Sequence, residues 1–335
     1  MRSQVAVLFG VIVAAGTVAL AEPAAAPSGP ARVAEAAGET GWHTFITARE
    51  LARELDGPNA PLVIDVRSAK AYEAGHIPGA INIPGSGLRT AADEVGPNGE
   101  IVAEKTIFVN AQGFPDVARY EKIFSEAGLE RDQDVVIYGN FAGNADGTVP
   151  VVILRWLGQH RVRFVEGVGT EEWTSIGREL SREPRRLPPS RYVAKPASGV
   201  IWQLDDVLGN LGNDEVVFFD CRTEEEFVGK DTRGTKHGGH IPGAVWLDSQ
   251  SLLDQYSKRS VSREVVLEKL AERGITPDKT VVIYCQTGTR CTLPFLQLQD
   301  LGFEKVALYD ASWTEYGDRD DTPKGDGRPS AAPAS

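Results

Sequence analysis

The chain has 335 residues, of which 41% are hydrophobic, and a formal net charge of -12. This length and composition suit two globular domains with full cores, and they exclude a disordered or coiled-coil protein for most of the chain. The negative field repels polyanions, so nucleic acid and anionic membrane surfaces are excluded as general partners, whereas a small local anion site is compatible with it.

Residues 1–21 have the pattern of a secretory signal. Arg2 supplies a positive start, residues 5–19 form an apolar run, and Ala19-Leu20-Ala21 is a small-x-small cleavage site. We therefore expect a periplasmic or otherwise exported protein, with no stable membrane insertion after cleavage near Ala21. A retained anchor helix is the alternative, although the apolar stretch is short for a span of roughly 20 residues. Residues 22–40, rich in Ala, Pro and Gly, are expected to form a flexible lead.

Residues 41–181 alternate short apolar strands with helical segments, as α/β domains do. The pattern predicts strands at Leu62–Val66, Ala80–Ile83, Val135–Tyr138 and Val162–Val165. It predicts helices near Ala69–Ala74, Val117–Ala127 and Val149–Leu157. Residues 182–198 contain four prolines among several arginines and are predicted to be a linker.

Residues 199–317 show the same alternation. Strands are predicted at Val216–Phe219, Ala244–Leu247, Val281–Tyr284 and Lys305–Leu308. Helices are predicted near Glu224–Val228, Ser262–Arg273 and Arg290–Leu301. The tail of residues 318–335 is charged and then rich in Pro, Ala and Ser, so we expect it to be disordered.

The two halves are copies of one domain. The sequence Gly-His-Ile-Pro-Gly-Ala occurs at residues 75–80 and again, letter for letter, at 239–244. A strand that ends in Asp-x-Arg precedes it in both halves, and a Val-Val-Ile-Tyr strand follows it in both. Parallel strands joined by helical crossovers are the natural assembly. The expected fold is therefore α/β, with two tandem domains that are each a mainly parallel sheet flanked by helices.

The candidate nucleophile is Cys285, which stands where the strand Val281–Tyr284 ends and a helix is expected to begin. In that position backbone N–H groups converge on one spot, and the positive end of the helix favours a thiolate or another anion. Gly288 permits a tight loop. Cys285 is the candidate catalytic residue, and the residues expected to bind substrate are Gln286, Thr287, Gly288, Thr289 and Arg290.

Comparison within the chain isolates this loop. The ungapped internal alignment pairs Cys285 with Gly139, which has no nucleophile, and residues 140–144 carry no basic side chain. The first half is therefore expected to be inactive and structural. Features shared by both halves are explained by folding, so His76, His240 and the Asp-x-Arg pairs are expected to be structural, the latter as buried ion pairs or caps.

The remaining cysteines, Cys221 and Cys291, are expected to be small buried residues, and their pairing with Cys285 on oxidation stays open. Scattered histidines and the absence of a CxxC pair predict no metal site, and no cofactor is expected.

These motifs together resemble the tandem rhodanese-type sulfurtransferases. The resemblance covers residues 41–317 and rests on Asp-x-Arg after a strand, Gly-His-Ile-Pro-Gly-Ala, the strand with its Cys loop, and Tyr309-Asp310-Ala311-Ser312-Trp313 before a final helix. It implies a catalytic cysteine in the second domain and an inactive first domain. It also implies that Cys285 takes a sulfur atom from a small anionic donor such as thiosulfate, forms a persulfide, and passes the sulfur to a thiophilic acceptor such as cyanide or a thiol. We expect a monomer.

The loop departs from the usual members of that family. Thiosulfate-type relatives usually carry Cys-Arg-Lys-Gly and mercaptopyruvate-type relatives Cys-Gly-Ser-Gly, whereas this chain has Cys285-Gln286-Thr287-Gly288. Where both types usually place a substrate-binding arginine, this chain has Glu226, with Lys230 and Arg233 just beyond. Thiosulfate is the favoured donor, and 3-mercaptopyruvate is the alternative. Arg290 either contacts the donor or fixes the loop through a salt bridge.

Two other functions compete. A cysteine phosphatase loop needs five residues between Cys and Arg, but here only four separate Cys285 from Arg290, and the smaller ring suits a compact sulfur species better. A sulfur carrier or redox sensor would use Cys285 without turnover.

Overall fold

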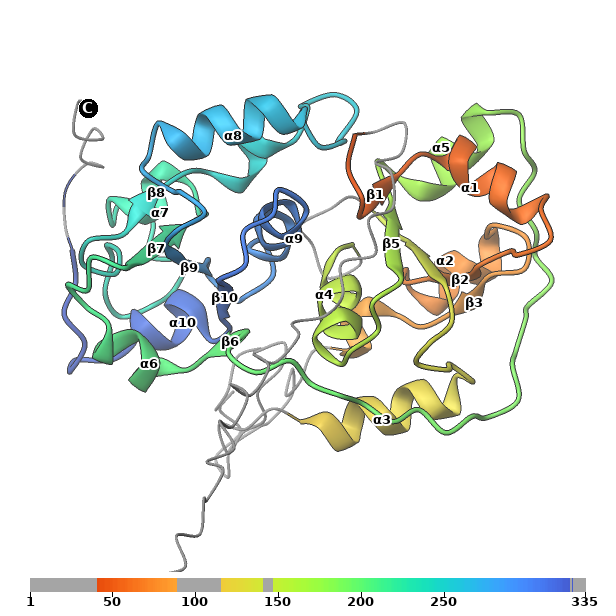
Figure 1. Cartoon of the computed structure of the whole chain (residues 1–335), viewed down its shortest axis with the longest axis horizontal. Helices are drawn as coiled ribbons and strands as arrows, with labels where there is room; N and C mark the ends of the chain where they lie inside the picture. The colour runs from red at the N-terminus through yellow and green to blue at the C-terminus, as the bar shows by residue number, and fades with distance from the viewer. Residues whose placement is uncertain (1–40, 89–115, 141–146, 326, 328–335) are drawn as a thin grey trace, which may run out of the picture. The chain divides into compact units, whose positions relative to one another are not determined.

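The computed structural model describes residues 41–88, 116–140, 147–325 and 327. Over these residues the chain forms two five-stranded sheets, one from each half of the sequence, with helices beside each sheet (Figure 1). All pairings between the strands are parallel. The predicted fold class is confirmed. The predicted signal and flexible lead lie outside the described residues.

The sheet of the first half has the strand order β1-β5-β4-β2-β3. Its strands are β1 (Phe45–Ile46), β2 (Leu62–Asp65), β3 (Ile81–Asn82), β4 (Val135–Tyr138) and β5 (Val162–Val165). Its helices are α1 (Ala48–Leu55), α2 (Ala69–Ala74), the 3-10 turn η1 (Gly85–Leu88), α3 (Val117–Glu126), α4 (Val149–Trp156) and α5 (Gly169–Ser175).

The sheet of the second half repeats this topology in the order β6-β10-β9-β7-β8. Its strands are β6 (Ile201–Trp202), β7 (Val216–Asp220), β8 (Val245–Trp246), β9 (Thr280–Tyr284) and β10 (Val306–Tyr309). Its helices are α6 (Leu204–Gly209), α7 (Glu224–Phe227), the 3-10 turn η2 (Ser249–Leu252), α8 (Arg263–Ala271), α9 (Thr292–Asp300) and α10 (Ser312–Tyr316).

The strand register is the same in the two sheets. Asp65 lies opposite Tyr138 in the first, and Asp220 lies opposite Tyr284 in the second. The residues that follow these two tyrosines, Gly139 and Cys285, therefore occupy equivalent positions, as the internal alignment predicts.

Both faces of each sheet are buried, as expected for parallel sheets covered by crossover helices. Side chains that point to one face pack against α1, α2 and α5 in the first half and against α6 and α10 in the second. The opposite faces, covered by α3 and α4 and by α8 and α9, belong to one apolar cluster that includes residues of both halves. Cys285 and Cys291 are part of this shared cluster, so the core positions the candidate nucleophile.

Polar contacts also tie the first half to helix α9, which follows the cysteine loop. The carboxylate of Asp300 accepts hydrogen bonds from the backbone N–H groups of His43 and Thr44 at 3.0 and 2.7 Å and from Thr44 Oγ1 at 2.6 Å. At the other end of the helix, Thr148 Oγ1 lies 2.8 Å from Thr292 Oγ1. The first half thus contacts both ends of α9.

The segment predicted to be a linker runs without helix or strand over residues 184–197. Tyr192 is buried, and the N–H groups of Lys195 and Ala197 donate to Leu157 O and Trp156 O at 2.8 Å each. The linker is therefore fastened to the first half.

The predicted disorder of the tail is wrong for residues 318–325. Gly325 N donates to His240 O at 2.8 Å, and buried Thr322 donates through Oγ1 to Tyr316 O at 2.7 Å. These backbone and side-chain partners outweigh the high charge of the segment, on which the prediction rested.

No helix within the described ranges is both long enough and apolar enough to cross a membrane. The export segment predicted for residues 1–21 is not among those ranges.

Candidate active site

Cys285 directly follows strand β9 and is fully buried. The loop leads into α9, which begins at Thr292 with Cys291 as its N-cap, two residues later than the sequence predicts. Gln286 and Gly288 are buried too, whereas Thr287, Thr289 and Arg290 are partly exposed. The predicted site residues therefore form one short loop with a buried sulfur and a partly exposed polar rim.

Ser312 holds this loop in shape. Its Oγ accepts hydrogen bonds from Cys285 N at 3.2 Å and from Gly288 N at 3.1 Å, and it donates to Tyr309 O at 2.9 Å. Ser312 has φ of +56°, which is rare for a residue with a side chain and costs conformational energy. Ser312 belongs to the Tyr-Asp-Ala-Ser-Trp motif, but the sequence pattern does not predict this role for it. The only sequence feature that points to this role is the position of Ser312 as a polar residue between two buried apolar segments.

The start of α10 binds the carbonyl groups of the same loop. Trp313 N donates to Cys285 O at 3.0 Å, and Thr314 donates to Gln286 O from both N and Oγ1, at 2.9 and 2.7 Å. With the loop carbonyls occupied in this way, the backbone is pre-organised before a substrate arrives.

Gly288 has a conformational role, as predicted, but its N–H is not directed at the nucleophile. Its φ is +76°, and a Cβ at this position would lie 2.7 Å from Asp310 O. The Gly288 N–H donates to Ser312 Oγ, so it is not one of the backbone N–H groups expected to converge at the end of β9.

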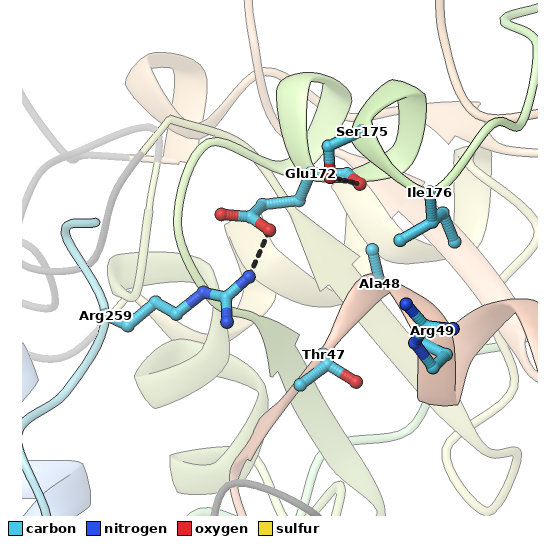
Figure 2. A pocket seen from close by; sticks show the side chains of 7 residues that line it. All are labelled: Thr47, Ala48, Arg49, Glu172, Ser175, Ile176 and Arg259. Carbon is cyan, nitrogen blue, oxygen red and sulfur yellow. Dashed lines mark hydrogen bonds and ion pairs between the residues drawn. The ribbon is translucent and has the colours of Figure 1, made fainter.

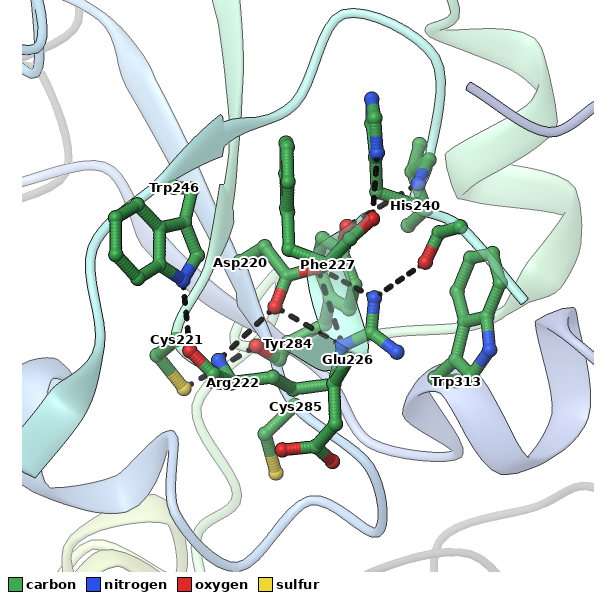
Figure 3. Close-up of polar contacts among 12 residues, drawn as sticks. Asp220, Cys221, Arg222, Glu226, Phe227, His240, Trp246, Tyr284, Cys285 and Trp313 are labelled. Atoms are coloured by element: carbon green, nitrogen blue, oxygen red, sulfur yellow. Dashed lines mark hydrogen bonds and ion pairs between the residues drawn. The ribbon is translucent and has the colours of Figure 1, made fainter. Parts of the chain in front are cut away.

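Cys285 lies between two other thiols, Cys221 and Cys291, and all three are buried and free (Figure 3 shows Cys221 and Cys285). Burial alone raises the pKa of Cys285, but hydrogen bonds from Cys221 and Cys291 and the charge of Arg290 outweigh it, so that this pKa falls well below its ordinary value. Burial raises the pKa of Cys221 and Cys291 well above the ordinary value. Cys285 is therefore the thiol that ionises.

Each neighbouring thiol has one proton and two acceptors within reach. Cys221 Sγ lies 3.2 Å from Tyr284 O, and Cys291 Sγ lies 2.8 Å from Gly288 O. A thiolate is a stronger acceptor than a carbonyl. The same two S–H groups are the hydrogen-bond donors that lower the pKa of Cys285.

Arg290 forms a two-pronged ion pair with Glu226. Its Nη1 and Nη2 each lie 2.7 Å from a carboxylate oxygen of Glu226. The Glu226 side chain is 2% exposed and the Arg290 side chain 24%. Of the two roles predicted for Arg290, the structure shows the salt bridge that fixes the loop, although its charge still acts on Cys285.

A buried ion pair between Asp220 and Arg222 fixes the end of strand β7. Arg222 Nη2 lies 2.7 Å from Asp220 Oδ2 and donates to Gly239 O at 2.7 Å (Figure 3). The guanidinium also faces the ring of Trp313 at 4.5 Å. Arg67 and Asp65 make the equivalent pair in the first half, at 2.6 Å. The prediction that the Asp-x-Arg residues form structural ion pairs is confirmed.

The histidines of the repeated turns are structural as well. His240 Nδ1 lies 2.9 Å from Phe227 O, and its ring stacks on Phe227 at 3.8 Å. His76 makes the same contacts with Tyr72, at 2.8 and 3.8 Å. Both imidazoles are buried and bonded to backbone carbonyls, as predicted.

Comparison with known proteins agrees with this architecture. The model of the Rhodanese-like domain matches residues 47–176 and again residues 203–319. The chain belongs to the rhodanese family.

Curated relatives of this rhodanese-family chain carry the name thiosulfate sulfurtransferase. One from Azotobacter vinelandii is 32% identical over 288 residues, which is 83% of this chain and 95% of the relative. Another from Pseudomonas aeruginosa is 28% identical over 283 residues, again 83% of this chain and 95% of the relative. Among solved structures, an anaerobic ergothioneine biosynthesis enzyme from Chlorobium limicola superposes with a TM-score of 0.69 at 21% identity, covering 85% of this chain and 71% of that one. That likeness shows the fold alone.

The first rhodanese-like domain lacks the groups that make the site reactive. Gly139 occupies the position of Cys285, and Val66 that of Cys221, with Val66 N donating to Tyr138 O at 3.0 Å as Cys221 N donates to Tyr284 O at 3.1 Å. Most of the loop that follows Gly139 lies outside the described residues. The backbone frame is thus common to both domains, and Gly139 and Val66 replace the thiols of Cys285 and Cys221.

A separate cavity of 280 Å³ lies at the seam of the two rhodanese-like domains. It is lined by Thr47, Ala48, Arg49, Glu172, Ser175, Ile176 and Arg259. Arg259 reaches from the second domain to pair with Glu172 of α5 (Figure 2). The cavity shares no lining residue with the cysteine loop, so we assign it no part in the chemistry.

Proposed function

We propose that this rhodanese-family sulfurtransferase moves a sulfane sulfur from thiosulfate or a related donor to a thiophilic acceptor, through a persulfide on Cys285. The observation that carries the proposal is the buried Cys285 sulfur, whose pKa is lowered by two neighbouring thiols and by Arg290. A thiol with a lowered pKa ionises more readily and acts as a nucleophile without a separate general base. Relatives named thiosulfate sulfurtransferase that cover most of the chain support the donor class.

In the first step the thiolate of Cys285 attacks the outer sulfur of the donor. A sulfur–sulfur bond forms to the enzyme, the sulfur–sulfur bond of thiosulfate breaks, and its electron pair leaves with sulfite. In the second step the acceptor attacks the outer sulfur of the persulfide, and the electron pair of the broken bond returns to Cys285 as thiolate. The enzyme is unchanged after both steps, so the mechanism predicts ping-pong kinetics.

The loop residues have distinct roles in this proposal. Cys221 and Cys291 stabilise the thiolate as hydrogen-bond donors, and Ser312 keeps the loop closed around it. Gln286, Thr287 and Thr289 supply the polar surroundings of the donor, and Arg290 fixes the loop through its ion pair with Glu226 and lowers the pKa of Cys285. A preformed set of donors costs little reorganisation during the reaction.

The test is thiocyanate formation from thiosulfate and cyanide by the purified protein and by Cys285→Ser. We expect turnover with parallel double-reciprocal plots for the wild type and none for the variant. Equal inactivity of both proteins with thiosulfate, thiosulfonates and 3-mercaptopyruvate would leave a non-catalytic carrier or sensor as the better account. A preference for 3-mercaptopyruvate would favour the alternative sulfurtransferase.

We also propose that the protein is exported and cleaved near Ala21. The support is the order of Arg2, the apolar run and the small-x-small site in the sequence. Sequencing the N-terminus of the protein from a periplasmic or secreted fraction tests this. A mature protein that begins near Glu22 is the expected result, and one that retains Met1 in the cytoplasm contradicts it.

A further inference from the structure

We infer that Glu226 determines donor specificity: by neutralising Arg290 it makes the Cys285 site select sulfur donors with one negative charge over dianions such as thiosulfate. The inference rests on the proposed function, because it concerns the donor of the same persulfide-forming step. Among the donors of the proposed function it gives preference to monoanionic sulfane-sulfur compounds, of which thiosulfonates, R–SO₂–S⁻, are the simplest chemical representatives, while thiosulfate remains a donor with a lower kcat/KM.

The ion pair uses the part of Arg290 that would otherwise bind a donor. Both terminal nitrogens of the guanidinium donate to Glu226 at 2.7 Å, so the two-pronged face that suits an oxyanion is occupied. The carboxylate is 2% exposed and is also held by Thr223 N, which donates to its Oε2 at 3.1 Å as part of a capping box at the start of α7. Glu226 therefore stays beside Arg290.

Other charges near the loop do not restore a positive field. Arg222 is paired with Asp220, and Arg233 is 59% exposed and lies 4.0 Å from Glu226. Asp248 is close enough to Arg290 and Glu226 to interact with both. Burial raises the pKa of Asp248, and the charges of Glu226 and Glu225 raise it further. Arg290 and a backbone N–H oppose this rise without cancelling it. Glu224 and Glu225 are exposed on the first turn of α7.

The charge of the donor determines how strongly the carboxylate of Glu226 repels it. A carboxylate acts on an approaching anion with an energy proportional to the charge of that anion. If the charge of Glu226 disfavours a monoanion by about threefold in kcat/KM, it disfavours a dianion by the square of that factor, about tenfold. The change in the ratio of kcat/KM for two donors of different charge, between the wild type and a variant, therefore reports the field at Cys285, because the intrinsic reactivity of each donor cancels.

The step with a thiosulfonate is balanced in the same way as the step with thiosulfate. The Cys285 thiolate attacks the outer sulfur of R–SO₂–S⁻, a sulfur–sulfur bond forms to the enzyme, and the bond between the outer sulfur and the sulfonyl sulfur breaks. The electron pair leaves with the sulfinate, R–SO₂⁻. Both sides carry two negative charges, and neither an oxidant nor a reductant is needed.

The experiment compares kcat/KM for thiosulfate and for methanethiosulfonate in the wild type, in Glu226→Gln and in the control Glu225→Gln. Glutamine keeps the volume of Glu226 and can still serve in a capping box. Glu225 is exposed and lies next to Glu226, so its replacement makes the same change in net charge without touching the ion pair. We expect Glu226→Gln to raise kcat/KM about tenfold for thiosulfate and about threefold for methanethiosulfonate. We expect Glu225→Gln to change the ratio of the two by less than about twofold.

Salt dependence of the wild type gives a second measurement that needs no variant. If the site repels a dianion more than a monoanion, kcat/KM for thiosulfate relative to methanethiosulfonate rises as salt screens the field. A ratio that falls with salt, or a Glu226→Gln protein that folds and leaves the ratio unchanged, overturns the inference while sulfur transfer itself persists. Failure of all these proteins to transfer sulfur from either donor overturns the proposed function instead. If Glu226→Gln does not fold, a ratio that falls with salt still overturns the inference.

Discussion

The two rhodanese-like domains separate what the fold requires from what the chemistry requires. Both keep an Asp-x-Arg pair, a histidine stacked on an aromatic ring, and a tyrosine hydroxyl that accepts from the N–H after that histidine, Tyr138 from Ile77 at 3.0 Å and Tyr284 from Ile241 at 3.1 Å. Only the second adds thiols at the strand ends. The shared set is therefore a folding requirement, and the cysteine loop is an addition to it.

The turns after the equivalent strands differ in the way they are fastened. In the first domain Gly169 N donates to Gly139 O at 3.1 Å, and a Cβ on Gly169 would meet the Tyr138 ring. In the second domain Trp313 N donates to Cys285 O at 3.0 Å, and Ser312 adds bonds to two loop N–H groups. The same backbone contact is thus kept, and a hydroxyl is added where a nucleophile must be held.

The largest expected effect is the loss of the nucleophile. Cys285→Ser should lower the rate of sulfur transfer by roughly 10³-fold or more, because serine is not ionised at neutral pH. The comparison between the two domains is tested by placing a cysteine at the equivalent position of the first domain, as Gly139→Cys in the Cys285→Ser protein. We expect no recovery of thiocyanate formation, because the residues after Gly139 carry no basic side chain. Recovery would show that a cysteine at the strand end suffices.

Breaking the Arg290–Glu226 pair should have the next largest effect. Arg290→Ala leaves a carboxylate that is 2% exposed without its main partner, so we expect a loss of about 3 kcal/mol in the free energy of unfolding. It should also raise the pKa of Cys285, because the charge of Arg290 lowers it. Chemical denaturation measures the first effect, with Arg233→Ala as the control. Equal, small losses in both variants would mean that the pair contributes little.

Removing the hydroxyl that closes the loop should have a smaller effect. Ser312→Ala removes the acceptor of two buried N–H groups, and we expect a loss of about 1–2 kcal/mol in the free energy of unfolding. Ser312→Gly makes the same deletion but tolerates the φ of +56°, so it should be less destabilising than alanine. Thermal unfolding of the two variants separates the effect of losing the Ser312 hydroxyl from the effect of backbone strain at this residue. A Ser312→Ala protein that is at least as stable as the Ser312→Gly protein would argue against backbone strain at residue 312.

The smallest expected effect is on the ionisation of Cys285 when one of the two neighbouring thiols is removed. The pKa of Cys285 lies below its ordinary value, so the thiolate is complete above that pKa and is lost as the pH falls through it. Cys221→Ala and Cys291→Ala each remove a hydrogen bond to the thiolate and should move this loss to higher pH. Thiolate ultraviolet absorbance as a function of pH, with Cys285→Ser as the blank, follows the change. An unshifted profile in both variants would exclude the two thiols as donors.

Much of the fold was predictable because the sequence repeats itself. Strands β4 and β5 and helix α2 have the predicted bounds, and most other predicted elements differ by one or two residues at their ends. Strands β1 and β6 were missed because two residues are too short to show alternation. Helix α1 was missed although Thr47 and Glu50 form the capping box that marks its start.

The candidate site was predictable in its position but not in its contacts. The strand end and the comparison with Gly139 isolate Cys285 and its loop from the sequence alone. The Arg290–Glu226 ion pair and the hydrogen bond between Ser312 and Cys285 join residues far apart in the chain. No local sequence pattern predicts such contacts. Glu226 stood out only as a departure from a family pattern, and the structure adds its partner.

The most direct test of the central claim is mass spectrometry of the protein after exposure to a sulfur donor without an acceptor. We predict one added sulfur atom on the peptide that contains Cys285, none on Cys221, and removal of that sulfur by cyanide. Cys285→Ser should remain unmodified under the same conditions. A protein that turns over thiosulfate or methanethiosulfonate without ever carrying sulfur on Cys285 would contradict the account.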